Sequence, residues 1–201
     1  MTSIDFIHDT TFESLPKPTI KEAVRCFVDT FGVAVGGSQT QVAHIIHNHA
    51  ARQFGGDAAT LWQDGRRVSA AGAALANAMT IDSLDAHDGH KLTKGHVGCG
   101  VLPGLIAMME AEGKADAHEL LTSIVIGYEI GTRAGIALHA SARDYHTSGA
   151  WIALATAALG ARQLGLTQAQ TREAVGIAEY HGPRSQMMRC IDAPTMVKDG
   201  S

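Results

Sequence analysis

This sequence of 201 residues has few cysteines, no long apolar run and little excess of either charge. The three cysteines, Cys26, Cys99 and Cys190, are an odd number, lie far apart and form no C-x-x-C pair. This pattern indicates reduced thiols rather than a disulfide framework, and it predicts a cytoplasmic location.

No segment of the sequence is suited to a membrane. The stretch from Gly149 to Ala161 is free of charge and strong polarity but stops at Arg162, well short of the roughly 20 residues that span a bilayer. The first ten residues carry three ionisable side chains and lack the basic start and apolar run of a secretory signal. We therefore expect no membrane partner.

Charge is nearly balanced, since 16 Lys and Arg residues face 20 Asp and Glu residues and give a net charge of −4. A protein that binds nucleic acid usually carries a basic surface, so we expect no nucleic-acid partner. With 45% hydrophobic and 18% charged residues, the chain has the composition of one folded domain or little more.

Common catalytic and nucleotide-binding motifs are also missing. The sequence has no G-x-S-x-G, which argues against a serine nucleophile on a hydrolase elbow. It has no G-x-x-x-x-G-K-[ST] and no G-x-G-x-x-G, so it offers no obvious cradle for nucleotide phosphates.

Helix signals are frequent. A capping box pairs an N-cap hydroxyl or carboxylate with a carboxylate or amide three residues later, and it favours a helix start. Three such boxes precede apolar residues at helical spacing, at Thr19 to Glu22, Asp116 to Glu119 and Thr167 to Gln170. We expect further helices over about 41–54, 69–84 and 101–112.

One segment has the pattern of a hairpin instead. Short apolar stretches at 59–62 and 67–68 flank Asp64-Gly65, a pair typical of a type I′ turn. A lone two-stranded ribbon needs helices to pack against. The sequence therefore predicts an all-α fold of six to eight helices with one short β-hairpin.

Ionisable side chains gather in one loop. Seven of the twelve residues from 85 to 96 are ionisable: Asp85, His87, Asp88, His90, Lys91, Lys94 and His96. Because helices are expected on both sides, this loop is held by a scaffold, where functional groups often lie. A solvated surface loop is the alternative interpretation.

Two smaller polar clusters follow along the chain. His146 lies just before an apolar run, hence near a helix N-terminus, where backbone N–H groups favour an anion. Lys198 follows a group of loop cations between His181 and Arg189, which taken alone are more typical of a surface.

A metal site is a second hypothesis for the acidic and histidine-rich loop. Its possible ligands are Asp85, His87, Asp88 and His90, and His87-Asp88 resembles the dyad of helical metal-dependent phosphohydrolases. Those enzymes also need a histidine on an earlier helix and a distant aspartate, for which His44, His47 and Asp144 are available. The helical phase, however, turns His44 away from the buried face of its helix. Since Lys91 and Lys94 also repel a cation, we expect no bound metal.

Six segments carry a family resemblance through their order and spacing. They are FVDTFGVAVGG (27–37), SLDAHDGHKLTKGHVGCGVLPGL (83–105), IGYEIGTRAG (126–135), YHTSGAWIALATAALGARQLGLT (145–167), AVGIAE (174–179) and TMVKDG (195–200). From residue 19 to its end the chain resembles the MmgE/PrpD family, which includes 2-methylcitrate dehydratase, cis-aconitate decarboxylase and iminodisuccinate epimerase. That family joins an all-α domain to a smaller α/β lid. The resemblance implies that residues 1–201 are the N-terminal portion of the helical domain, a fragment that ends before the lid.

The resemblance also implies site residues. Asp85-Ala-His-Asp88 matches the family's Asp-x-Asp-Asp, with His87 in place of an aspartate. His96 and His146 match its two histidines, and Lys198 matches the lysine of its Met-Val-Lys motif.

The implied function is a cofactor-independent lyase that removes water or CO2 from a small citrate-like polycarboxylate such as 2-methylcitrate. The expected catalytic residues are Asp85, Asp88, His96 and His146, and the expected substrate-binding residues are Lys198, Lys91 and Lys94. Such a reaction builds negative charge beside a carboxylate, so it needs fixed cations and an acid–base pair. The resemblance further implies a homodimer of the full-length protein. A metal-dependent phosphohydrolase of the His-Asp type and a non-catalytic helical module stay open as alternatives.

Overall fold

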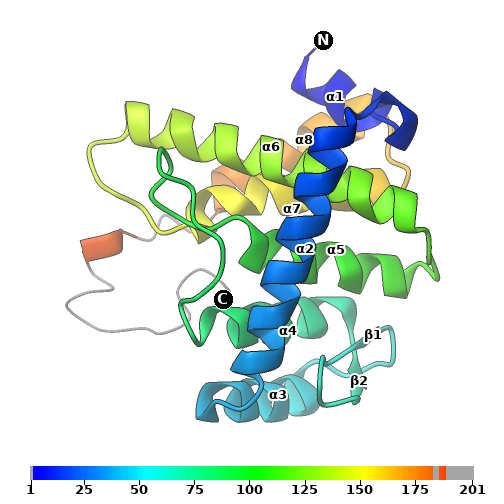
Figure 1. Ribbon diagram of the computed structural model, residues 1–201, viewed down its shortest axis with the longest axis vertical. Coiled ribbons are helices and arrows are strands. Elements are labelled where there is room, and N and C mark those ends of the chain that lie inside the picture. Colours follow the sequence, from blue (N-terminus) through cyan, green and yellow to red (C-terminus); the bar gives the residue numbers. More distant parts are fainter. Residues whose placement is uncertain (1, 183–185, 189–201) are drawn as a thin grey trace.

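The computed structural model describes residues 2–182 and 186–188, and this part of the chain is mainly helical (Figure 1). Its eight α-helices are α1 (Ser3–Asp9), α2 (Lys17–Gly37), α3 (Gln41–Gln53), α4 (Ala70–Asp82), α5 (Gly98–Ala111), α6 (Ala117–Ser141), α7 (Gly149–Gln163) and α8 (Gln168–His181). A 3-10 turn, η1 (Phe12–Ser14), follows α1, and β1 (Ala59–Thr60) pairs antiparallel with β2 (Arg67–Val68). The predicted all-α fold with one short hairpin is confirmed. Among the described helices, none is both long and apolar enough to cross a membrane.

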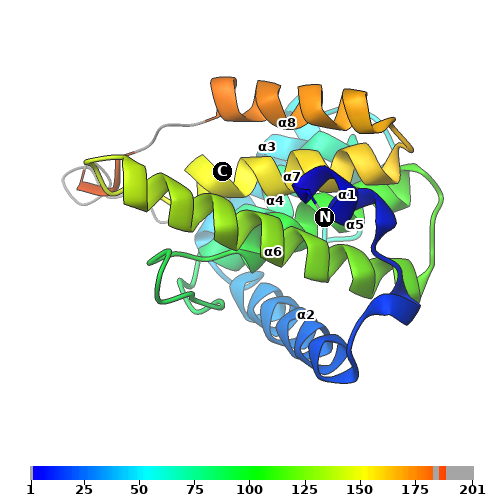
Figure 2. The same cartoon turned by 90° about the horizontal axis from the view of Figure 1, so that it is seen from above.

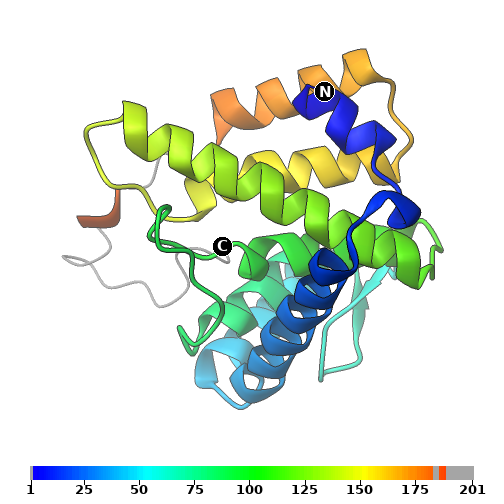
Figure 3. The same cartoon turned by 45° about the horizontal axis from the view of Figure 1, so that its top comes forward.

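The main core lies where α5, α6 and α7 meet, with α2 and α4 packed against them. Leu102 and Leu105 of α5, Ile126 of α6 and Trp151 of α7 are almost completely buried. Figure 2 shows α2 on one side of the molecule and α8 on the other, with α6 and α7 between them. This packing leaves the long α4–α5 connection at one end of the bundle, beside the α6–α7 connection (Figure 3).

Two of the three predicted helix caps are confirmed. The Thr167 side chain accepts a hydrogen bond from the Gln170 backbone N–H, and the Gln170 side chain accepts from the Thr167 N–H, so α8 begins with a complete capping box. Asp116 caps α6, but Glu119 does not complete the box because its carboxylate pairs with Arg162 instead.

The third predicted cap is wrong, because α2 begins two residues before Thr19. The helix starts at Lys17, directly after Pro16 and with Pro18 in its first turn. Proline holds φ near the helical value and lacks an N–H that the first turn would leave unpaired, so it favours this earlier start. Glu22 therefore lies inside the helix, where its carboxylate pairs with Arg25 at 2.6 Å.

The predicted type I′ turn of the hairpin is also wrong. That turn needs positive φ at both central residues, whereas positive φ occurs at Gln63 (62°) and Gly65 (84°) but not at Asp64. The connection is a wider loop in which the Leu61 carbonyl accepts from the N–H groups of Asp64 and Gly65. Two hydrogen bonds of 2.6 and 2.7 Å from the Arg66 guanidinium hold the Asp64 carboxylate within this loop.

Arg162 of α7 fastens the N-terminal segment to the bundle. Its guanidinium donates to both carboxylate oxygens of Glu119, at 2.8 and 2.9 Å. It also donates to the carbonyls of Ile7 and Thr10, at 2.6 and 3.0 Å. The last carbonyls of a helix lack intrahelical partners, so a charged donor here both satisfies α1 and holds it in place.

Candidate active site

The α4–α5 loop is folded back on itself and tied to the start of α7. Asp85 and Lys94 adopt left-handed φ values of 49° and 48°, and the His90 N–H donates to the Gly95 carbonyl at 2.9 Å. The His96 N–H donates to Ser148 Oγ at 2.9 Å, and the Tyr145 hydroxyl donates to the Lys94 carbonyl. The two polar clusters that the sequence singles out at 85–96 and 143–148 are therefore in direct contact.

The indole ring of Trp151 packs against this junction. A Cβ added to Gly95 of the loop would lie 2.9 Å from the indole ring of Trp151, and one added to Gly135 of α6 would lie equally close. Both glycines therefore give space to the same ring, which is 1% exposed. The loop and α6 are packed on one aromatic side chain.

His96 is oriented by its own loop. Its Nδ1 lies 2.6 Å from the backbone carbonyl of Asp88. Because a carbonyl can only accept, Nδ1 carries the proton and Nε2 holds the lone pair. That Nε2 lies 3.7 Å from the Asp85 carboxylate, and the His96 side chain is 25% exposed. His96 thus offers solvent a nitrogen that can accept a proton, with an anion beside it.

His87 is buried beneath His96 and pairs with an aspartate. Its Nε2 lies 3.3 Å from Asp82 Oδ1, both side chains are fully buried, and the rings of His87 and His96 are 4.1 Å apart. Asp82 was not predicted as part of the site. The signal was present, however, because Asp82 is the one charged residue in the alanine-rich segment 69–83.

Asp88 acts through its backbone carbonyl and is otherwise turned inward. Its carboxylate accepts from the Gly98 N–H at 3.2 Å, at the first residue of α5. Burial raises the pKa of the Asp88 carboxyl above its ordinary value, although the Tyr128 hydroxyl and the Gly98 N–H act in the opposite direction. Burial and the nearby Asp88 carboxylate raise the pKa of Tyr128 as well. The sequence placed Tyr128 only in a family motif and gave it no role.

His146 repeats the arrangement of His96. Its Nδ1 lies 2.8 Å from the Asp144 carbonyl, so Nδ1 is again the protonated nitrogen and Nε2 the acceptor. The backbone N–H of His146 donates to Nε2 of His139 at 3.4 Å. Burial lowers the pKa of His139, and this neighbour was not predicted from the sequence.

The predicted substrate-binding lysines are not among the contacts that hold the two loops together. Lys91 and Lys94 are exposed, and the Lys94 ammonium lies 5.8 Å from the centre of the Tyr145 ring. Lys198 lies outside the described residues. The structure thus brings the loops of Asp85, Asp88, His96 and His146 together, whereas the contribution of the lysines stays a prediction.

Three side chains of the loop could together hold a metal ion. One ligand atom from each of Asp85, His87 and His96 lies within 4.8 Å of the others. The phosphohydrolase hypothesis required a metal ligand from an earlier helix, such as His44 or His47. His44 is exposed, and His47 Nε2 is hydrogen-bonded to Thr80 Oγ1 at 3.1 Å. Among the described residues, neither histidine belongs to the metal-compatible group.

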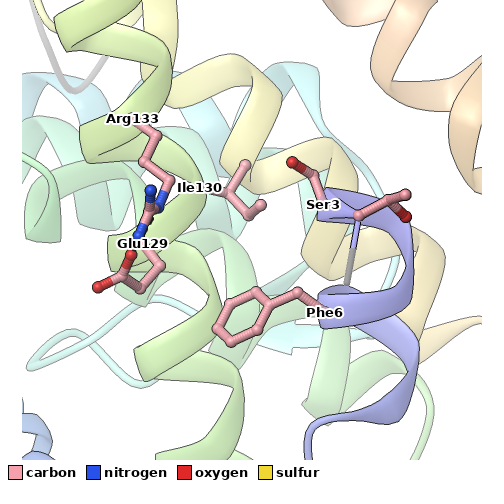
Figure 4. Close-up of a pocket in the computed structure, with 6 residues that line it drawn as sticks. Ser3, Phe6, Glu129, Ile130 and Arg133 are labelled. Atoms are coloured by element: carbon pink, nitrogen blue, oxygen red, sulfur yellow. Dashed lines mark hydrogen bonds and ion pairs between the residues drawn. The ribbon is translucent and has the colours of Figure 1, made fainter.

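Several cavities border α6, and two of them bear on the location of the site. One of about 270 Å³ lies between α1 and α6 and contains none of the predicted site residues; Figure 4 labels Ser3, Phe6, Glu129, Ile130 and Arg133 around it. Another of about 260 Å³ lies between α2 and α6 and is lined in part by Cys26, His90 and Tyr128. The second cavity adjoins the histidine-rich loop.

The sequence profile of the MmgE/PrpD N-terminal domain matches residues 4–198. The chain belongs to the MmgE/PrpD family. A cis-aconitate decarboxylase of Homo sapiens is 31% identical over 186 residues, which cover 87% of this chain and 38% of that protein. One of Mus musculus is 30% identical over 188 residues, covering 87% and 37%. A cis-aconitate decarboxylase-like protein of Aspergillus oryzae is 30% identical over 122 residues, covering 56% and 25%.

These MmgE/PrpD relatives are much longer than the chain, which spans less than two fifths of their length. The family contains lyases, and the helical structure described here matches the N-terminal domain of that family. The resemblance led us to expect an aspartate at position 87, and the chain has His87, which lies buried against Asp82.

Proposed function

We propose that the whole protein is a cofactor-independent lyase of the MmgE/PrpD type that removes water or CO2 from a small citrate-like polycarboxylate. The observation that carries the proposal concerns two histidines in loops that contact each other. Both rings make the same kind of hydrogen bond. His96 and His146 each donate Nδ1–H to a backbone carbonyl, which leaves each Nε2 as a proton acceptor. Both are also the histidines that the family motifs single out.

The chemistry explains why such groups are needed. Dehydration breaks a C–H and a C–O bond: a base takes the carbon-bound proton, and the hydroxyl leaves with a second proton as water. Decarboxylation breaks a C–C bond, releases CO2, and returns a proton to the carbon. Both reactions build negative charge on carbon next to a carboxylate, so a proton-transfer group and fixed positive charge stabilise the transition state.

The residues then take the following roles. His96 and His146 move protons, and the Asp85 carboxylate, 3.7 Å from His96 Nε2, stabilises the imidazolium that forms. Asp88 orients His96 through its backbone carbonyl. Lys198 binds a substrate carboxylate, with Lys91 or Lys94 adding positive charge at the rim. We further propose that the full-length protein works as a cytoplasmic homodimer.

The test is activity of the full-length protein on citrate, 2-methylcitrate and cis-aconitate, followed by loss of water or CO2. We expect turnover of one of them, and a decrease of roughly 10²–10⁴-fold in kcat for His96→Gln and for His146→Gln. Lys198→Ala should mainly raise KM, because a carboxylate anchor binds substrate and transition state alike.

His44→Gln is the matched control, since His44 is an exposed histidine of α3 outside the loop. It should keep full activity. Equal activity of the His96 and control variants would refute the assignment of the site. Hydrolysis of a simple phosphodiester, with none of the three acids consumed, would favour the phosphohydrolase instead.

A further inference from the structure

His87 adds a possible metal ligand to the histidine-rich loop. We infer that Asp85, His87 and His96 form a binding site for a borderline first-row divalent cation such as Zn²⁺, and that its occupation inhibits the enzyme. The binding rests on the geometry of these residues alone. The inhibition rests on the proposed function, because it requires His96 to be a proton-transfer group.

The spacing of the ligand atoms is close to that of a bound ion. Tetrahedral Zn²⁺ with bonds of about 2.0–2.1 Å places its ligand atoms roughly 3.4 Å apart. His96 Nε2 and Asp85 Oδ1 are already 3.7 Å apart, and all three ligand atoms lie within 4.8 Å of one another. Asp85 is exposed, so its side chain can adjust toward an ion.

Both histidines are held by the kind of partner that metal-bound imidazoles have. A ligating histidine usually donates its other ring N–H to a carbonyl or carboxylate, which fixes the ring and raises its donor strength. His96 donates Nδ1–H to the Asp88 carbonyl at 2.6 Å. The buried carboxylate of Asp82 lies 3.3 Å from His87 Nε2, so this imidazole also has an acidic neighbour.

Charge and access also favour a cation here. Carboxylates of Asp82 and Asp85 lie against the two imidazoles. The Asp85 side chain is 59% exposed, so an ion can enter from solvent. Lys91 and Lys94, which led us to expect no metal, are both exposed, so solvent and salt weaken their repulsion of a cation at the three ligands. Two nitrogens and one carboxylate select zinc-like ions over Mg²⁺ or Ca²⁺, which prefer oxygen ligands.

Occupation of the site would remove the proton acceptor. An ion bound to Nε2 of His96 uses the lone pair that would otherwise take a proton from the substrate. The proposed reaction thus proceeds without a metal, and Zn²⁺ acts as a reversible inhibitor.

Binding is tested on the metal-free protein, titrated with Zn²⁺ against a chromogenic chelator. We expect one equivalent to bind, and Asp85→Asn and His87→Gln each to weaken it by at least about tenfold. His49→Gln is the control, because His49 is an exposed histidine of α3 and should leave affinity unchanged. Co²⁺ should give the intense visible absorption of a four-coordinate ion with the wild type and lose it with Asp85→Asn. Since Asp85 is exposed, that variant should fold even if His87→Gln does not.

Zn²⁺ affinity that is unchanged by Asp85→Asn, or weakened by His49→Gln, would overturn the binding site. Inhibition is measured separately on the active full-length protein, where Zn²⁺ should abolish turnover at the concentration that fills the site, and a chelator should restore it. Full turnover with the site filled would overturn the inhibition and the role of His96, while the binding data would stand independently.

Discussion

Asp88 shows how one residue can serve a site through its backbone while its side chain serves the fold. Its carbonyl orients His96, and its carboxylate accepts from the first N–H of α5. The sequence identified this aspartate through its place in a motif and left open whether it orients a histidine or takes part directly. Which of its two groups faces the histidine depends on the backbone path of the loop, and residue spacing alone does not determine that path.

The raised pKa of Asp88 predicts a pH-dependent cost to folding. Between the ordinary and the raised pKa, the Asp88 carboxyl is deprotonated in the unfolded chain but still protonated in the folded state. The free energy of unfolding therefore falls as pH rises from the ordinary aspartate pKa through the raised pKa. Asp88→Asn keeps an acceptor for Gly98 and does not titrate. We therefore expect the variant to gain stability relative to the wild type as pH rises from about 4 to 7.

Urea unfolding at several pH values measures this difference. Asp57→Asn, at an exposed aspartate beside the hairpin, is the control and should show the same pH profile as the wild type. A difference between Asp88→Asn and the wild type that is constant with pH would contradict the prediction.

At the scale of elements, the start of α5 makes a tight contact between the loop and the helices. A Cβ at Gly98 would lie 2.5 Å from the Tyr128 hydroxyl, 2.6 Å from Thr30 Oγ1 and 2.7 Å from Asp88 Oδ1. We expect Gly98→Ala to lower the free energy of unfolding by about 1–3 kcal/mol through overpacking. It should also lower activity, because Asp88 and with it His96 must shift.

Gly176→Ala in α8 is the matched substitution, since a Cβ there meets nothing within 4 Å. Alanine in an open helix interior should stabilise by about 0.5–1 kcal/mol. Thermal or chemical unfolding of the two variants should give changes of opposite sign. Similar values for both would show that the Gly98 contact relaxes without cost.

Two of the arginine–carboxylate pairs predict a second contrast. Arg162 and Glu119 are 15% and 26% exposed and make several further hydrogen bonds, whereas Arg133 and Glu129 are 75% and 48% exposed. Arg162→Ala leaves the Glu119 charge without its partner and should cost about 3–5 kcal/mol. Arg133→Ala should change stability by less than about 0.5 kcal/mol.

Urea unfolding gives both values, and hydrogen exchange locates the effect. Arg162→Ala should speed exchange in α1, whose last carbonyls lose their donor, before it affects α5. Protection of α1 that is equal in both variants would contradict the role given to Arg162.

The elements follow from the sequence where one local signal acts alone, and they were missed where two local signals compete or the contact is tertiary. The caps at Asp116 and Thr167 were predicted because cap and partner lie within three residues. The start of α2 was missed because two prolines outweigh a hydroxyl cap, and the hairpin turn was missed because a long side chain, Arg66, holds its loop. The Asp82–His87 pair joins a helix end to a loop, and its contact depends on tertiary packing.

At the scale of the whole molecule, α2 presents an apolar face to solvent. Val24, Val28 and Val35 are 42%, 62% and 44% exposed. Such a face favours association, and the expected homodimer would cover it. We predict that residues 1–201 sediment above the 21.1 kDa of a single copy, and that Val24→Glu/Val28→Glu shifts them toward a single copy.

Analytical ultracentrifugation across a concentration series provides the measurement. Ile177→Glu/Tyr180→Glu on α8 is the comparison, because those side chains are also exposed, at 60% and 79%. A wild type that is monomeric at every concentration would refute association, and dissociation by the α8 variant alone would place the contact on α8.

The position of Trp151 between the loop and α6 has an optical consequence. The chain has two tryptophans, and Trp151 is the one whose ring touches both Gly95 and Gly135. Its emission should therefore respond to rearrangement of the histidine-bearing loop, whether a substrate, an inhibitor or an ion causes it. Replacing Trp62 with phenylalanine would leave a single fluorophore beneath the site, so that the motion of this loop could be followed in real time without an added label.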